Sequence, residues 1–109
     1  MIKAINYWSF PGGLDGTKDV KQAIKDARKL GYEGIELSFG DSGTLSPSTT
    51  AKEIQDILKT AKAEKIKLSS LAAGFYWAYN FASSKIEDRK KAVEMTKKYI
   101  DTAEALGVD

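Results

Sequence analysis

The stretch from residue 20 to residue 39, VKQAIKDARKLGYEGIELSF, decides the fold class of this chain. Its first half carries apolar residues at helical spacing, at positions 20, 23, 24, 27 and 30. Gly31 follows, where a left-handed C-terminal helix cap is expected. The second half, from Gly34 to Phe39, predicts a short buried strand. A helix that stops at a glycine and leads directly into a strand is the repeating step of an α/β protein.

The same step occurs on both sides of this stretch. Before it, a strand is predicted over residues 2–10, followed by a glycine-rich turn and a helix that Thr17 or Asp19 caps. After it, Thr50 and Glu53 form a capping box for a second helix, and a third strand is predicted over residues 66–73. The three strands therefore begin at positions 2, 34 and 66, at a constant interval.

The third helix is the last one that the pattern predicts. Ser84 and Glu87 form a second capping box, and the helix is expected to end at Gly107. Val108 is expected to be the first residue of a fourth strand. The chain thus divides into βα units at about residues 1–31, 32–64 and 65–107.

Strand–helix alternation predicts parallel strands joined by right-handed crossovers. The doubly wound open sheet and the eightfold βα barrel both use this alternation, but a barrel requires about 250 residues. A chain of 109 residues would then be three consecutive βα units of a (βα)8 TIM barrel, a partial barrel with the helices outside. An open three-stranded sheet would leave both edges unpaired, which predicts self-association or pairing with the missing barrel half.

Composition excludes several kinds of chemistry. The chain has no cysteine and no histidine, so disulfides, thiolate nucleophiles and Ser-His-Asp triads are excluded. Its net charge of +2 gives no argument for nucleic acid, and the lysines interleave with acids along the helices. Neither a secretory signal nor a membrane span is recognisable, which predicts a cytoplasmic protein. No phosphate-loop or dinucleotide motif occurs, so the glycines at 12, 13 and 16 are expected to make turns.

Aromatic residues gather where the predicted strands end. Nine of the eleven lie at or just beyond a strand's carboxyl end, which is the ligand-binding end in both architectures. Flat aromatic faces suit the apolar C–H faces of sugars. The alternative is a small core formed by the loops themselves, since aromatic side chains bury large areas. The nine are Tyr7, Trp8, Phe10, Phe39, Phe75, Tyr76, Trp77, Tyr79 and Phe81.

Glu36 is the acidic residue that the strand pattern singles out for a functional role. Strand alternation places Ile35 and Leu37 on one face and Glu36 on the other, toward the interior of a barrel. A carboxylate in such a place requires a function or a partner, and Lys67 on the next strand is a possible ion-pair partner. Asn6 could also face inward and offer hydrogen bonds to a hydroxylated ligand.

Four segments resemble sugar phosphate isomerases/epimerases of the xylose-isomerase-like βα-barrel superfamily: residues 5–10, 27–37, 66–71 and 103–108. The resemblance implies interconversion of ketoses and aldoses, or epimerisation of ketoses, with a divalent metal (Mn, Mg, Co or Zn). In this family the metal ligands and acid/base glutamates come from later strands, so no catalytic residue or metal ligand is assigned within this segment. The early strand ends line the substrate pocket, which implies substrate-binding roles for Asn6, Tyr7, Trp8, Glu36, Phe75 and Trp77.

The leading hypothesis is therefore the N-terminal portion of a barrel that acts on a small sugar or sugar phosphate by metal-assisted proton transfer. The 109 residues alone are expected to be inactive. One alternative is a self-associating half-barrel with a structural or sugar-binding role. Another is a fragment of a repair-endonuclease-like barrel, which is disfavoured because such sites use several histidines.

Overall fold

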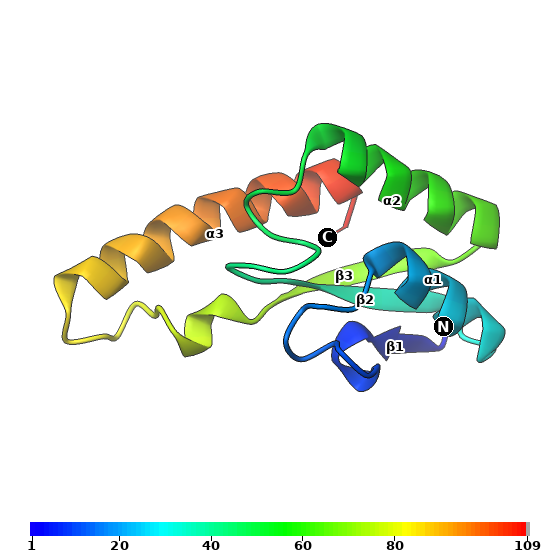
Figure 1. Ribbon diagram of the computed structural model, residues 1–109, viewed down its shortest axis with the longest axis horizontal. Coiled ribbons are helices and arrows are strands. Elements are labelled where there is room, and N and C mark those ends of the chain that lie inside the picture. The colour runs from blue at the N-terminus through cyan, green and yellow to red at the C-terminus, as the bar shows by residue number, and fades with distance from the viewer. Residues whose placement is uncertain (109) are drawn as a thin grey trace.

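The computed structural model describes residues 1–108, which form a three-stranded parallel sheet with helices packed against one face. The strands lie in the order β1-β2-β3, and all of them point the same way (Figure 1). This is the α/β arrangement predicted from the alternation, and it matches part of a TIM barrel. The elements are β1 (Ala4–Asn6), η1 (Tyr7–Ser9), α1 (Val20–Lys29), β2 (Gly34–Phe39), α2 (Ala51–Glu64), β3 (Lys67–Ala73), η2 (Phe75–Trp77) and α3 (Ile86–Leu106).

Local capping explains where the first two helices begin and end. The Asp19 carboxylate accepts a hydrogen bond from the Gln22 N–H at 3.1 Å, which identifies Asp19 as the N-cap of α1. Gly31, just past the end of that helix, has the predicted positive φ of 89°. At α2, the Thr50 hydroxyl and the Glu53 carboxylate form both bonds of the predicted capping box.

The predicted capping box at Ser84 is wrong. α3 begins at Ile86 after Lys85, whose side chain makes no capping bond. The Ser83 hydroxyl, one residue earlier, accepts the Lys85 N–H at 3.2 Å and donates to Asp88 at 3.0 Å. The hydroxyl that stabilises this helix start therefore lies one residue before the one that the spacing favoured.

The first strand is shorter than residues 2–10. β1 ends at Asn6, because the Asn6 side-chain oxygen accepts the Trp8 N–H at 2.7 Å and turns the chain into η1. At the other end of the chain, α3 ends at Gly107 as predicted, with φ of 71°. Val108 donates to the Ala103 carbonyl and is not part of a strand, and the position after it lies outside the described residues.

The sheet register brings three polar residues into one row. Asn6 pairs with Glu36 across β1 and β2, and Glu36 pairs with Ser70 across β2 and β3. A bulge between Ile35 and Glu36 in this pairing skips Ser69, which changes the alternation of β3 midway. The three polar side chains consequently share the sheet face that the helices do not cover.

The core lies between the sheet and the helices. Ile35, Leu37 and Phe39 of β2 are fully buried there with Ile24 of α1 and Met95 of α3. Glu36 and Ser38, which point to the opposite face, are only half-buried. Figure 1 shows η2 and its loop continuing beyond the end of β3 before α3 returns along the molecule. None of the helices within residues 1–108 combines the length and apolarity needed to cross a membrane.

Candidate functional site

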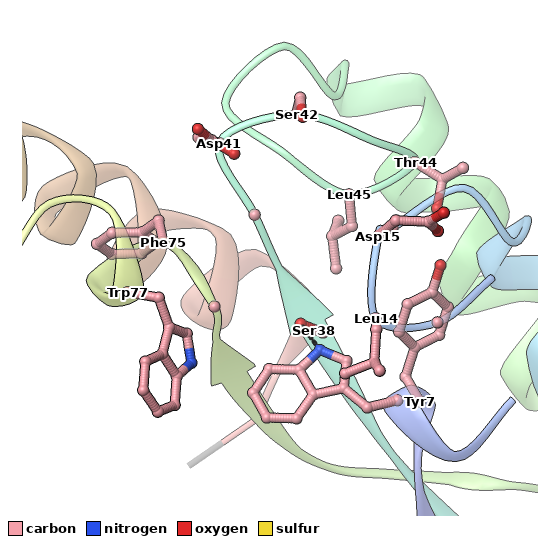
Figure 2. A pocket seen from close by; sticks show the side chains of 15 residues that line it. Tyr7, Leu14, Asp15, Ser38, Asp41, Ser42, Thr44, Leu45, Phe75 and Trp77 are labelled. Carbon is pink, nitrogen blue, oxygen red and sulfur yellow. Dashed lines mark hydrogen bonds between the residues drawn. The ribbon is translucent and has the colours of Figure 1, made fainter. Parts of the chain in front are cut away.

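A pocket of about 330 Å³ opens where the three parallel strands end. Its walls come from η1 and the turn after it, from the end of β2 and the loop after it, and from Gly74 with η2 (Figure 2). Segments after each of the three strands thus contribute, which is the usual place for a ligand site in parallel α/β folds. The pocket is the candidate functional site.

Trp8 forms one wall of the pocket, and its indole is held in place from two sides. The indole N–H donates to the Ser38 hydroxyl at 2.7 Å, across from η1 to the end of β2 (Figure 2). A Cβ placed on Gly74 would lie 3.6 Å from the indole ring, so the ring also lies close to the end of β3. One tryptophan therefore connects the carboxyl ends of all three strands.

A chain of hydrogen bonds beneath the pocket leads from Glu36 to this tryptophan. The Glu36 carboxylate accepts hydrogen bonds from the Asn6 amide and, at 2.6 Å, from the Ser70 hydroxyl. Asn6 in turn accepts the Trp8 N–H. Glu36 thus orients Asn6, and Asn6 sets the turn that carries the indole.

The predicted ion pair between Glu36 and Lys67 is wrong. Lys67 lies opposite Gly34 at the start of its strand, and its side chain is exposed. The two partners of Glu36 are a neutral amide and a neutral hydroxyl. Because the bulge in β3 brings Ser70 rather than its neighbour opposite Glu36, sequence alternation alone does not identify this partner.

The pocket rim is held together by hydrogen bonds between two loops. The Tyr7 hydroxyl and the Thr44 hydroxyl both donate to the Lys18 carbonyl, at 2.6 and 2.9 Å. The Thr44 N–H donates to the Gly16 carbonyl at 2.9 Å. Burial is the main reason that the pKa of Tyr7 is raised above its ordinary value, so this hydroxyl stays protonated as a donor.

Two carboxylates from different loops lie in the pocket lining, Asp15 and Asp41. One oxygen of Asp15 accepts the Thr17 hydroxyl at 2.7 Å and the Thr17 N–H at 3.1 Å. These bonds, with the hydroxyl the larger effect, hold the pKa of Asp15 below its ordinary value. Asp15 is therefore ionised at neutral pH.

The aromatic residues after β3 divide between a small core and the pocket mouth. Phe75 is 2% exposed and packs edge-on against Phe39 and Tyr99, with ring centroids 6.0 and 6.2 Å away. Trp77, two residues later, is 89% exposed at the pocket rim. Figure 2 shows their rings pointing to different sides of η2. Phe75 thus anchors the segment, and Trp77 presents a free aromatic surface.

Four of the six residues predicted to bind substrate line this pocket: Tyr7, Trp8, Phe75 and Trp77. Asn6 and Glu36 lie below it, on the polar face of the sheet. The pocket lining also includes Leu14, Asp15, Asp41 and Thr44, which no sequence pattern singles out. These residues lie in irregular loops, where neither periodicity nor a motif marks them.

The residues of this segment do not fit a divalent metal. Within residues 1–108, no three His, Cys, Asp or Glu side chains lie close enough together to hold an ion. Both oxygens of Glu36, the one acid in the strands, are engaged by Asn6 and Ser70. That any metal ligands come from other residues stays a prediction.

Comparison with known proteins adds two findings. The family model described as xylose isomerase-like TIM barrel matches residues 24–109. A crystal structure of D-psicose 3-epimerase in the presence of D-fructose superposes with a TM-score of 0.67, at 18% identity. The match covers 99% of this chain and 35% of the epimerase chain, and at this identity it shows the fold alone. No curated protein matches the chain.

Proposed function

This chain belongs to the xylose isomerase-like TIM barrel family, and we propose that it forms the sugar-binding N-terminal part of an isomerase or epimerase. Its three βα units, at about residues 1–31, 32–64 and 65–107, would be the first three of the barrel. The whole protein would isomerise or epimerise a small ketose or aldose in the cytoplasm. The divalent metal and the acid/base residues of that reaction would come from outside this segment.

One observation carries this proposal: an aromatic wall stands beside hydroxyl and carboxylate groups at the carboxyl ends of the strands. The indole of Trp8, fixed by Ser38, offers a flat apolar face of the kind that packs against the C–H face of a sugar. Asp15 and Asp41 are hydrogen-bond acceptors for the sugar's hydroxyl groups. The pocket volume of about 330 Å³ is within the range of small-molecule sites.

Calorimetric titration with free ketoses and aldoses tests the proposal in the protein at its native length. D-fructose, D-ribulose, D-xylose and D-glucose form a suitable panel. Replacing Trp77 with Ala removes a free aromatic surface at the rim and should weaken binding about tenfold, the value of about 1.4 kcal/mol expected for an aromatic contact. Phe81→Ala is the matched control, because Phe81 is also an exposed aromatic of the segment after β3 but does not line the pocket.

The binding proposal fails if no member of the panel binds, or if Trp77→Ala and Phe81→Ala have the same effect. The catalytic proposal has its own test. Residues 1–109 alone, with Mg²⁺ or Mn²⁺ added, should not epimerise a ketose above background. Turnover by this segment would contradict the assignment of all catalytic residues to other parts of the barrel.

A second candidate function, self-association, is supported by the outer side of α3. Ile86, Val93 and Ile100 recur at seven-residue spacing along this helix, and each is about half exposed. A second copy of the chain could cover this stripe in a structural or sugar-binding half-barrel. Light scattering after size exclusion should then show a dimer that Val93→Lys dissociates, whereas a monomer that persists at high concentration would refute self-association.

A further inference from the structure

We propose that this pocket accepts the hydroxyl-bearing end of a free sugar and rejects an end that carries a phosphate group. The inference rests on the proposed sugar-binding function and narrows its substrate class. Three observations support it: the charges of the lining side chains, the hydrogen bonds of the lining glycines, and the position of Lys18. Each concerns a group that phosphate recognition would need.

The charged side chains of the lining are all negative. Asp15 and Asp41 line the pocket, and no Lys or Arg side chain does so within residues 1–108. Phosphate sites in proteins use cationic side chains or free backbone N–H groups, because the ligand carries only hydrogen-bond acceptors and negative charge. A phosphate dianion in this pocket would meet two carboxylates and no compensating positive side chain.

The glycines that line the pocket do not offer free N–H groups to replace the missing cations. Each glycine of the lining already donates its N–H to a carbonyl within the protein, at 2.9 to 3.2 Å. The N–H groups of these glycines are therefore not available for the contacts with which glycine loops bind phosphate. The N–H groups donate to carbonyls in four pairs: Gly13 donates to Phe10, Gly16 to Gly13, Gly40 to Leu45 and Gly74 to Phe39.

Lys18, a cation in the loop after η1, is also committed elsewhere. Its ammonium group forms an ion pair with Asp26 at 2.8 Å and lies 5.4 Å from the centre of the Phe10 ring. Only its backbone carbonyl faces the rim, where Tyr7 and Thr44 donate to it. The side chain of Lys18 thus connects the loop before α1 to Asp26 of that helix and does not neutralise a ligand in the pocket.

The carboxylate oxygens that stay available in the pocket are acceptors. The second oxygen of Asp15 and both oxygens of Asp41 accept no hydrogen bond from the described residues. Sugar hydroxyls donate hydrogen bonds, and carboxylates are strong acceptors for them. The two carboxylates therefore complement a polyol that donates, packed beside Trp8 and Trp77, rather than a phosphate that accepts.

Matched ligand pairs test this inference in the protein at its native length. Calorimetry would compare D-fructose with its 1-phosphate, 6-phosphate and 1,6-bisphosphate, and D-ribulose with its 1,5-bisphosphate. A bisphosphate presents a phosphate at whichever end enters, so it should bind about tenfold more weakly than the free sugar, or worse. The measured quantity is the ratio of the dissociation constant of the bisphosphate to that of the free sugar. Raising the salt concentration from 0.1 M to 1 M shortens the Debye length from about 10 to about 3 Å and should reduce this ratio.

Charge-neutral variants separate repulsion from poor fit. Asp15→Asn combined with Asp41→Asn should bring the ratio close to one, by weakening the free sugar and strengthening the bisphosphate. Asp101→Asn on α3, an exposed acid that does not line the pocket, is the matched control and should leave the ratio unchanged.

The outcomes distinguish this inference from the proposed function. A bisphosphate that binds as tightly as the free sugar would overturn the inference while leaving sugar binding intact. An unchanged ratio in the double variant would also overturn it, because the carboxylates would then not be the cause. Binding of no ligand in either series would overturn the proposed function and the inference together.

Discussion

Gly13 should be the glycine that the pocket tolerates least when it is replaced. A Cβ at this position would lie 2.2 Å from the Tyr7 carbonyl oxygen, 2.9 Å from the Phe10 carbonyl oxygen and 2.9 Å from the Trp8 Cα. All three are backbone atoms, so no side-chain rotation relieves the contact. Favourable contacts of carbon atoms lie at about 3.5 to 4.0 Å. The turn would therefore have to move away from η1 by roughly 1 Å.

The expected cost of Gly13→Ala is about 3 kcal/mol of unfolding free energy, the upper end of the usual range for overpacking. Two other glycines supply controls. Gly31→Ala meets no atom within 4 Å but has a φ of +89°, so it should cost about 1 to 2 kcal/mol through backbone strain alone. Gly74→Ala has a negative φ and only an ordinary contact at 3.6 Å, so it should change stability by about 0.5 kcal/mol or less.

Urea unfolding followed by circular dichroism measures all three variants in the protein at its native length. The predicted order of destabilisation is Gly13→Ala first, Gly31→Ala second and Gly74→Ala last. The reasoning would be refuted by a Gly13→Ala variant as stable as Gly31→Ala. In that case the turn after η1 would be free to move, and the position of Trp8 would not depend on it.

Three further predictions concern the groups around the pocket. Burial is the main cause that raises the pKa of both Tyr7 and Tyr99, so the folded state keeps these hydroxyls protonated when the unfolded chain ionises near pH 10. Their contribution to stability is complete below that pH and is lost as the pH rises above it. Urea midpoints measured from pH 8 to 11 should therefore fall less steeply for Tyr7→Phe combined with Tyr99→Phe than for the wild type, and equal slopes would contradict this. Glu36→Gln should lose about 1 kcal/mol of stability and shift Trp8 fluorescence, because one acceptor oxygen for Asn6 or Ser70 becomes a donor. Glu33→Gln, at an exposed acid, is its control, and an equal effect of the two would count against the Glu36 hydrogen-bond chain. Phe75→Ala should cost about 3 to 5 kcal/mol, as measured by urea unfolding, because it empties the centre of the aromatic cluster. A loss below about 1 kcal/mol would show that the cluster does not anchor η2.

The sequence by itself determined the elements whose signals are local. The bounds of β2, the Thr50–Glu53 box and the glycine ends of α1 and α3 all follow from residues within a few positions of one another. For the start of α1 the sequence offered Thr17 or Asp19, and the structure has Asp19 as the cap. Alternation along β2 also placed Glu36 on the polar face correctly. Local hydrogen bonds and the strand period decide such features, so they can be predicted without knowing what packs nearby.

The early end of β1 has a local cause that the sequence pattern nevertheless does not identify. Its signal, Asn6 accepting the Trp8 N–H, is local, but the apolar run through Phe10 is equally consistent with a longer strand. At the start of α3, two adjacent serines offered alternative caps, and only the path of the loop selects Ser83. Sequence spacing alone does not choose between neighbours that satisfy the same rule.

Only the tertiary structure decided the partners of Glu36 and the composition of the pocket. The bulge in β3 brings Ser70 opposite Glu36, and strand pairing adds Asn6 from a residue 30 positions away. Likewise, the pocket joins Asp15 and Asp41 because the hydrogen bonds of Thr44 hold their two loops together. These contacts depend on register and loop path, which the energy of the whole fold selects, so no short stretch of sequence contains them.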